Sequence, residues 1–258
     1  MGRYKVLFEG EKTIVIQLKD GIKAQDLVAK GVFIQKADGL YDKKGRKVII
    51  SDREFFRITE PRLVGSCGGS VYEIFDNVVI TAGHVMQCVD NLIVNNTNYK
   101  LVNKEVILPK TYPQWLWHIF NSIGYEPYSP YDYGIAYIQT NQSLRYNADK
   151  PYPHAMYVAG NCVSKYDQNC LGIALATPNM ELSDLNALID RQLILDCTYW
   201  DYQAVAYGID VGKVFVNYGD GKYALLRPAL LIRFLNMAGI PGCSGSMIYP
   251  TVPYPDFP

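Results

Sequence analysis

Three polar side chains that lie far apart in the sequence have the types that nucleophilic catalysis requires: a serine, a histidine and an aspartate. Ser244 lies in residues 241–246, PGCSGS, whose glycines let the backbone turn tightly and approach a ligand closely. In such a loop the N–H groups of Gly242 and Ser244 could converge on a developing oxyanion. Loops rich in glycine and serine are also common without any function, so a nucleophilic Ser244 needs a base nearby.

His84 is the histidine best placed to be that base. Residues 78–85, VVITAGHV, predict a buried strand that runs into a turn of small residues, which would present an imidazole at the edge of a barrel. His118 lies between two apolar residues and His154 follows a proline, so we expect both in structural or exposed positions. Taken alone, His84 also fits a structural histidine.

A catalytic histidine needs a carboxylate that orients it. Asp132 directly precedes residues 133–138, YGIAYI, a predicted strand with a small residue near its start. The alternative for Asp132 is a turn residue after Pro130.

Together these segments resemble those of the trypsin/chymotrypsin-like serine endopeptidases. Residues 67–70 (CGGS) and 81–84 (TAGH) look like the family's C-G-G-S and T-A-[AG]-H segments, residues 132–136 (DYGIA) look like its aspartate strand, and residues 242–246 look like its G-x-S-G-[GS] loop. The order His, Asp, Ser is that of the family, with separations of 48 and 112 residues. The motifs match residues 67–85, 130–138 and 240–248, and the implied fold covers roughly residues 53–250.

The resemblance implies an all-β fold of two six-stranded antiparallel β-barrels with an active site between them. His84 and Asp132 would come from the first barrel, and Ser244 from the second. Ser244 would attack the carbonyl of a polypeptide substrate, His84 would transfer the proton, and Asp132 would fix the imidazole tautomer. The N–H groups of Gly242 and Ser244 would form the oxyanion hole. The expected activity is a serine endopeptidase, self-processing or polyprotein-processing in the style of viral and bacterial members, without metal or organic cofactor.

Cys243 is a rival nucleophile, because some viral relatives of this fold use cysteine. Moving the register by one residue would put Pro241, which has no N–H, at an oxyanion-hole position. We therefore favour Ser244 and expect Cys243 to be a structural thiol or a disulfide partner. Digestive members of the family have an aspartate at the position of Cys243, so the zymogen switch is expected to be absent. Cys88 is the nearest candidate partner for Cys67 in the family's loop disulfide.

The same alignment places Ala238 near the floor of the primary specificity pocket. Without an acid there, the pocket is expected to prefer an apolar or small side chain over Lys or Arg.

Short β-rich runs separated by Gly, Pro, Asn and Asp follow one another from residue 54 onward, as in a sandwich or barrel. Helices are predicted at residues 24–31 and 181–192. We predict three regions: a ββα(ββ) segment over residues 1–52, a first barrel with His84 and Asp132 over residues 53–145, and a second barrel with Ser244 over residues 146–258.

Only 14 residues follow Ser244, whereas the family has two further strands and a helix after the strand that begins near Ser246. Three explanations stay open: further sequence after Pro258, a different closure of the barrel, or a circular permutation. In the permutation, residues 4–8 and 13–18 would supply the missing strands and pair near residues 246–249. The competing picture for the N-terminal segment is a small β-grasp-like domain, either regulatory or a pro-segment.

Composition and charge bound the remaining possibilities. Apolar residues make up 49% of the 258 residues, and Lys+Arg and Asp+Glu both number 25, so no nucleic-acid or membrane partner is expected. Residues 1–66 nevertheless carry +5 and residues 67–258 carry −5. The basic turn at residues 43–47 is expected to be a solvated loop.

The cysteines, the start of the chain and its apolar runs bear on compartment. Six cysteines leave three disulfides and six buried thiols both open, with thiols favoured because no secretion signal is evident. No apolar run suits a signal peptide or a membrane span, so a soluble chain is expected, and nothing indicates its oligomeric state.

Two other functions stay open at this point. The first is a catalytically silent binding module on the same fold, which the presence of all three triad residues disfavours. The second is an esterase that uses the same triad. An α/β-hydrolase, however, would place its serine before its aspartate and histidine.

Overall fold

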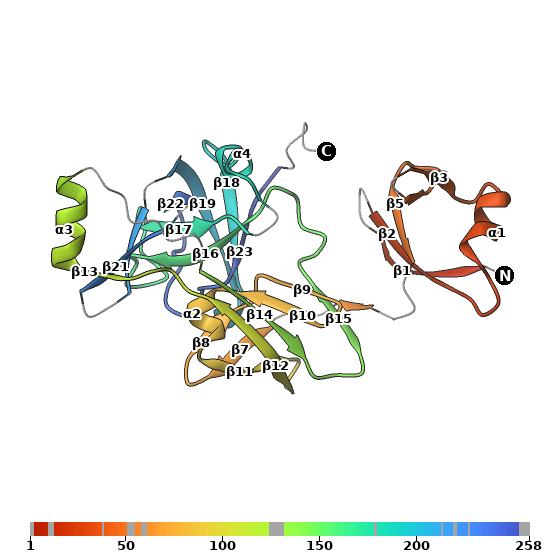
Figure 1. The fold of residues 1–258 in the computed structure, drawn as a ribbon, viewed down its shortest axis with the longest axis horizontal. Coiled ribbons are helices and arrows are strands. Elements are labelled where there is room, and N and C mark those ends of the chain that lie inside the picture. Colours follow the sequence, from red (N-terminus) through yellow and green to blue (C-terminus); the bar gives the residue numbers. More distant parts are fainter. Residues whose placement is uncertain are drawn as a thin grey trace. The chain divides into compact units, whose positions relative to one another are not determined.

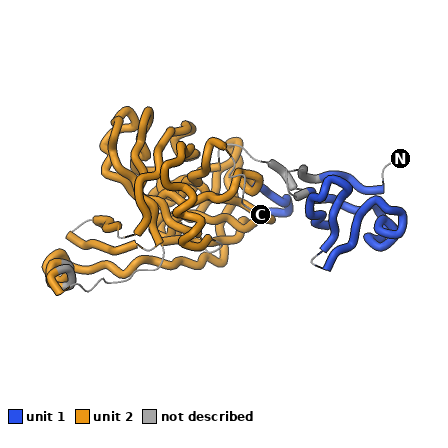
Figure 2. The backbone as a smooth tube through the Cα atoms, turned by 90° about the horizontal axis from the view of Figure 1, so that it is seen from above, with its two compact units in different colours: residues 1–57, 140–145 blue, residues 58–139, 146–258 orange. Residues whose placement is uncertain are grey.

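The structure is a computed structural model that describes residues 3–9, 13–37, 39–50, 55–57, 61–123, 132–177, 180–212, 214–218, 221–226 and 228–252. The chain forms two compact units, drawn blue and orange in Figure 2. Unit 1 comprises Met1–Arg57 with Thr140–Arg145, and unit 2 comprises Ile58–Gln139 with Tyr146–Pro258. The predicted boundary between residues 52 and 53 falls outside the described residues.

Unit 1 contains a small mixed sheet and one helix. Its elements are β1 (Tyr4–Glu9), β2 (Thr13–Leu18), α1 (Ala24–Ala29), β3 (Ile34–Lys36), β4 (Gly39–Tyr41), β5 (Lys47–Ile50) and β6 (Phe55–Arg57). The five-stranded sheet has the order β1-β2-β5-β4-β3, with β2 and β5 parallel. Leu27 of α1 is fully buried among Ile14, Ile16, Phe33 and Val48, which gives this sheet its own hydrophobic core. Within the same unit β6 pairs in parallel with β15 (Ser143–Tyr146).

The circular permutation is wrong. β1 pairs with β2 and β2 pairs with β5, so the N-terminal strands are used within their own sheet. The strand that follows Ser244, β23 (Met247–Pro250), pairs with strands of unit 2 on both of its edges. It therefore has no edge to offer to an N-terminal strand. After α1, three strands of the same sheet follow, one more than in the ββαββ order of the competing β-grasp-like picture, which stays a prediction.

The first half of unit 2 is one antiparallel sheet (Figure 1). Its strands are β7 (Arg62–Gly65), β8 (Gly68–Ser70), β9 (Glu73–Phe75), β10 (Val78–Thr81), β11 (Val89–Val94), β12 (Thr97–Ile107) and β14 (Tyr133–Ile138), and α2 (Gly83–Met86) follows β10. Within unit 2 these strands have the order β9-β10-β14-β12-β11-β7-β8. The prediction of a closed first barrel is therefore wrong for the described residues, where the sheet stays open.

Two tight turns fix the register of this sheet. Asp76 and Asn77 join β9 to β10 with φ of 48° and 66°, and Asn95 and Asn96 join β11 to β12 with φ of 48° and 62°. Two successive residues with positive φ are the geometry of a type I′ hairpin, which asparagine and aspartate tolerate better than other side chains. The hairpin after β9 sets β10, the strand that leads to His84.

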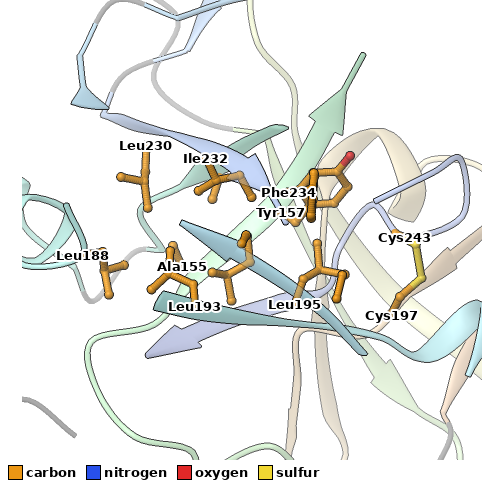
Figure 3. Close-up of a cluster of buried hydrophobic side chains, with 14 of the residues drawn as sticks. Ala155, Tyr157, Leu188, Leu193, Leu195, Cys197, Leu230, Ile232, Phe234 and Cys243 are labelled. Carbon is orange, nitrogen blue, oxygen red and sulfur yellow. A yellow bond between two sulfur atoms is a disulfide. The ribbon is translucent and has the colours of Figure 1, made fainter. Parts of the chain in front are cut away.

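The second half of unit 2 contains the predicted closed, six-stranded antiparallel barrel. Its strands are β16 (Ala155–Gly160), β17 (Leu171–Leu175), β18 (Gln192–Cys197), β19 (Tyr202–Val211), β22 (Ala229–Phe234) and β23, in the order β16-β17-β22-β19-β18-β23. Apolar side chains fill its interior (Figure 3). The fully buried ones include Leu193, Leu195, Leu230, Ile232, Phe234 and Ile248.

The barrel closes through strands that precede Ser244 in the sequence. β18 and β19 form a hairpin around the 3₁₀ turn η1 (Thr198–Trp200), and β18 pairs with β23 while β19 pairs with β22. The two strands expected after Ser244 are thus replaced by residues 192–211. Of the three explanations, a different closure of the barrel is the one that the topology supports.

The remaining elements of unit 2 lie outside these two sheets. They are β13 (Tyr112–Pro113), α3 (Gln114–Ser122), α4 (Leu182–Asn186), β20 (Val214–Asn217) and β21 (Lys222–Leu226). β13, β21 and β20 form a separate three-stranded sheet. The helix predicted over residues 181–192 is shorter than expected: α4 ends at Asn186, and a turn leads from there to β18 at Gln192. The helix α3 was not predicted.

All six cysteines form disulfides, so the preference for buried thiols is wrong. The pairs are Cys67–Cys88, Cys162–Cys170 and Cys197–Cys243. Cys88 is the partner of Cys67, as the sequence indicated.

Candidate active site

His84 lies at the start of α2, directly after β10. The small residues before it allow a close approach to the strand that follows Asp132: a Cβ at Gly83 would collide with the carbonyl oxygen of Ile107 and lie 3.0 Å from the nitrogen of Tyr133. The backbone N–H of His84 donates to Asp132 Oδ1 at 2.8 Å. The strand-to-turn segment thus fixes the histidine backbone against the aspartate.

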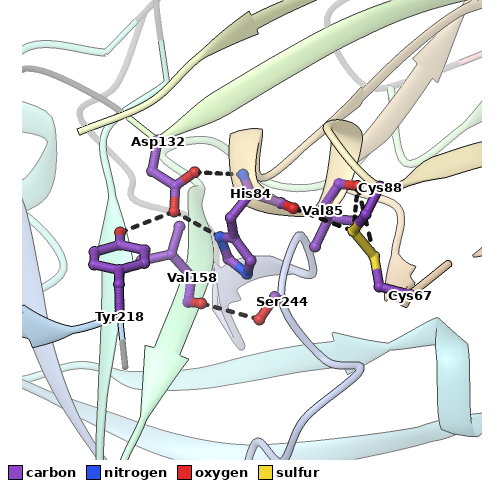
Figure 4. A network of polar contacts seen from close by, with 8 residues as sticks. All are labelled: Cys67, His84, Val85, Cys88, Asp132, Val158, Tyr218 and Ser244. Carbon is purple, nitrogen blue, oxygen red and sulfur yellow. Dashed lines mark hydrogen bonds and ion pairs between the residues drawn. A yellow bond between two sulfur atoms is a disulfide. The ribbon is translucent and has the colours of Figure 1, made fainter. Parts of the chain in front are cut away.

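Asp132 is fully buried at the start of β14, the strand that pairs with β10. Its Oδ2 atom lies 2.7 Å from His84 Nδ1, and the hydroxyl of Tyr218 donates to the same Oδ2 at 3.0 Å (Figure 4). The His84 side chain keeps 32% of its surface exposed, whereas that of Asp132 keeps none. The buried carboxylate of Asp132 thus contacts an imidazole that solvent reaches.

The loop with Ser244 packs against the segment that leads into His84. The N–H of Ser70 donates to the carbonyl of Ser244 at 3.0 Å. Gly245 has φ of +91°, and a Cβ there would collide with Thr81 Oγ1 and would lie 3.2 Å from the nitrogen of Ala82. In Figure 4 the imidazole nitrogen that is not bonded to Asp132 is directed toward Ser244.

The Ser244 hydroxyl itself has a different partner in this structure. Ser244 Oγ donates to the carbonyl oxygen of Val158 at 3.0 Å, and Val158 lies on β16 of the barrel. The structure therefore brings His84 and Asp132 into direct contact, and it brings Ser244 to the same site without a hydrogen bond to the imidazole.

Gly242 and Ser244, whose N–H groups were predicted to form an oxyanion hole, lie in a tight turn. Gly242 has φ of +97°, and the Cys243 N–H donates to the Ile240 carbonyl at 2.9 Å across the turn. Ser70 Oγ donates to the Gly242 carbonyl at 2.9 Å and holds the turn in place. Among the described residues, no acceptor takes the N–H of Gly242 or of Ser244.

Cys243 and Cys197 are fully buried and joined by a disulfide, so Cys243 has no free thiol in this structure. Ala238 is fully buried in the barrel core, where its N–H donates to the Lys165 carbonyl at 2.8 Å. The hydroxyl of Tyr202 donates to the Ala238 carbonyl. The role of Ala238 as a pocket residue stays a prediction.

The other two histidines lie away from the aspartate. His118 is exposed on α3. His154 precedes β16, and its Nδ1 atom hydrogen-bonds the hydroxyl of Tyr72, which follows β8. Burial lowers the pKa of His154 from 6.5 to about 4.

Tyr218 was not predicted to belong to the site. The chain has 21 tyrosines, and no local motif distinguishes this one from the others. Its partner Asp132 precedes it by 86 residues, so only the folded chain brings them together. Burial, followed by the charge of Asp132, raises the pKa of Tyr218, and the hydroxyl stays protonated as a donor.

Within the described part of the chain, no group of three or more His, Cys, Asp or Glu side chains is arranged to hold a metal ion. Across the same residues, none of the helices has both the length and the apolar character that a membrane crossing would need.

No protein-family profile matches the sequence, and no curated protein matches it. Among solved structures, the chain is similar to one described as "Crystal structure of Rv3671c protease, inactive form". The similarity covers 74% of this chain and 72% of that chain, with 13% sequence identity and a TM-score of 0.33.

Proposed function

We propose that the protein is a serine endopeptidase in which Ser244, His84 and Asp132 form the catalytic triad. The observation that carries the proposal is the 2.7 Å contact between His84 Nδ1 and the buried Asp132 carboxylate. This contact favours the imidazole tautomer with its proton on Nδ1, which leaves the lone pair of Nε2 free to accept a proton. The loop with Ser244 lies on that side of the ring (Figure 4).

In the proposed reaction, Ser244 Oγ attacks the carbonyl carbon of a peptide bond while His84 Nε2 takes its proton. The imidazolium then donates this proton to the leaving amine, and Asp132 stabilises the positive charge without accepting the proton. The N–H groups of Gly242 and Ser244 stabilise the oxyanion, and removing one such donor in an enzyme of this type costs about 3 kcal/mol in the barrier. Water then hydrolyses the acyl-enzyme by the same proton transfers.

The hydrogen bond from Ser244 Oγ to the Val158 carbonyl must break before the attack. Rotation about the Cα–Cβ bond of Ser244 exchanges this acceptor for His84 Nε2, and staggered rotamers of serine interconvert readily. The same hydrogen bond favours a second candidate, a catalytically silent binding module of chymotrypsin-like fold, in which Ser244 would keep Val158 as its partner.

Labelling with a serine-reactive fluorophosphonate separates the two candidates. We expect the full-length chain to be labelled, and we expect Ser244→Ala and His84→Ala to abolish the label. Asp132→Asn should slow labelling by about 10⁴-fold, because the amide favours the wrong tautomer. Ser122→Ala is the matched control, since the exposed Ser122 hydroxyl also donates to a backbone carbonyl, that of Ile119 at 2.8 Å.

An unlabelled native chain contradicts the endopeptidase and supports the silent module. If the chain is labelled but cleaves no peptide in a mixture of unfolded polypeptides, the peptidase activity is wrong. An esterase that uses the same triad is then the remaining candidate. Intact mass and terminal sequencing of the same sample report self-cleavage, which Ser244→Ala should prevent.

A further inference from the structure

Among the described residues, three hydrogen bonds hold the Asp132 carboxylate, and two of them come from His84. The backbone N–H of His84 donates to Oδ1 at 2.8 Å, and Nδ1 lies 2.7 Å from Oδ2. The third donor is the Tyr218 hydroxyl, 3.0 Å from Oδ2. Tyr218 also places its ring edge-on to the imidazole, with centroids 6.2 Å apart. One side chain from the later part of the chain thus contacts both members of the pair.

The element that carries Tyr218 is attached to the segment between His84 and Asp132. Tyr218 directly follows β20, and its N–H donates to the Lys222 carbonyl at 3.0 Å, which closes the β20–β21 hairpin. β21 in turn pairs with β13, with Pro113 opposite Lys222. β13 lies between β12 and β14 in the sequence, on the way from His84 to Asp132. This three-stranded sheet therefore fixes where the Tyr218 hydroxyl can lie.

We propose that Tyr218 is a positioning residue of the active site, which orients the Asp132 carboxylate for its hydrogen bond with His84. The proposal rests on the proposed function. Without the hydroxyl, Oδ2 would keep His84 Nδ1 as its one donor within the described part of the chain. The carboxylate could then rotate about its Cβ–Cγ bond, because terminal torsions of this kind are broad. With the Tyr218 hydroxyl present, both carboxylate oxygens of Asp132 are fixed. The imidazole of His84 then keeps one orientation, with Nε2 toward Ser244. Tyr218 acts through Asp132 and takes no part in the bond changes.

The Tyr218 hydroxyl keeps its proton at neutral pH and can therefore serve as a donor. Burial and the nearby Asp132 charge raise the pKa of Tyr218, so the O–H group does not ionise next to the carboxylate. Aspartate at this position therefore always faces a donor.

Tyr218→Phe removes the hydroxyl and keeps the ring against His84. We expect kcat for peptide or ester hydrolysis to fall about tenfold or more, because hydrogen bonds to charged groups are among the stronger ones. KM should stay within about twofold, because Tyr218 is not expected to touch substrate. Tyr146→Phe is the matched control: the Tyr146 hydroxyl donates to the carboxylate of Asp196 at 3.1 Å, outside the active site. It should leave both constants unchanged.

A second readout does not depend on activity. In the full-length chain with ¹⁵N-labelled histidine, the proton between His84 Nδ1 and Asp132 gives its own NMR signal. We expect Tyr218→Phe to shift or broaden this signal and Tyr146→Phe to leave it in place. If Tyr218→Phe changes neither kcat nor the signal, the proposal is wrong. If the native chain is inactive, the endopeptidase is wrong, and the signal alone then decides for or against positioning by Tyr218.

Discussion

At the residue scale, Gly245 shows how one position without a side chain permits the site. Its φ of +91° is unfavourable for any residue with a Cβ, and the space where that Cβ would lie is occupied by Thr81 Oγ1 and the Ser70 carbonyl. Ser70 lies on β8, and Thr81 ends β10, the strand that leads to His84. The absence of a side chain at residue 245 therefore lets the Ser244 loop lie close to the histidine.

We expect Gly245→Ala to lower both stability and activity. The left-handed conformation alone costs roughly 1–2 kcal/mol for a residue with a Cβ, and the collision moves the loop away from Thr81. Fluorophosphonate labelling of Ser244 should slow at least tenfold. Gly45→Ala is the control, because Gly45 also has positive φ, +80°, with nothing within 4 Å of the added Cβ. If Gly245→Ala and Gly45→Ala lose equal amounts of thermal stability and of labelling rate, the steric argument is refuted.

The three candidate catalytic residues could be predicted from sequence because their types stand in short segments with local geometry. The small residues before His84, the strand after Asp132 and the glycines around Ser244 are each visible within a few positions. Tyr218 could not be found this way, because its role depends on a hairpin that pairs with β13, more than 100 residues earlier. The Val158 acceptor of Ser244 was equally invisible, since any backbone carbonyl can accept.

At the element scale, β18 links the barrel to the Ser244 loop. It pairs with β23 immediately after that loop, and its last residue, Cys197, is bonded to Cys243, the residue before Ser244. The short β-rich run at β18 predicted a strand, but not its place in the barrel. Register and neighbours are set by long-range pairing, and here strand order departs from sequence order.

Removal of the Cys197–Cys243 disulfide tests the importance of this link. The bond closes a loop of 46 residues, so its loss should lower stability by about 4 kcal/mol in the loop-entropy estimate, whereas loss of Cys162–Cys170, with a separation of 8, should cost about 2.5 kcal/mol. We expect the double variant Cys197→Ala/Cys243→Ala to slow labelling of Ser244, because the residue directly before Ser244 is released from β18. The double variant Cys162→Ala/Cys170→Ala should label at the native rate. Denaturant unfolding and labelling of both double variants measure these effects. Equal labelling rates would argue against a role of the Cys197–Cys243 disulfide in positioning Ser244.

At the scale of the whole molecule, the sequence predicted an N-terminal segment and two β-rich halves. The N-terminal strands proved to have their own core around Ile16 and Leu27, which satisfies their apolar face without the barrel. That self-sufficiency could not be read from strand order alone, because strand, strand and helix fit both the permutation and a separate module. The first half of unit 2 was predicted to close like the second, yet its seven strands form an open sheet among the described residues.

Within unit 2, Tyr72 and His154 join the two halves through side chains. Tyr72 lies between β8 and β9 of the first sheet, and His154 directly precedes β16 of the barrel. The Tyr152 ring lies edge-on to the imidazole, with centroids 5.6 Å apart, and its hydroxyl donates to Asp184 Oδ2 at 2.6 Å. Burial raises the pKa of Tyr72, so this hydroxyl keeps its proton and the Nδ1 atom of neutral His154 is the acceptor. Protonation of His154 would place a second proton between the two groups.

This contact predicts a loss of stability in acid. Folding lowers the pKa of His154 from 6.5 to about 4, so between these values the unfolded chain binds a proton that the folded chain does not. The neutral imidazole therefore contributes fully to the free energy of unfolding above about pH 6.5. This contribution falls as the pH decreases and is lost by about pH 4, and the total loss is up to about 3 kcal/mol. Urea unfolding at pH 7 and pH 4.5 should show a smaller difference for His154→Gln than for the native chain. His118→Gln, which alters the exposed histidine on α3, should keep the native difference. If His154→Gln also keeps the native difference in stability between pH 7 and pH 4.5, acid destabilises the protein through other groups. The Tyr72–His154 contact then does not make the joining of the two halves depend on pH.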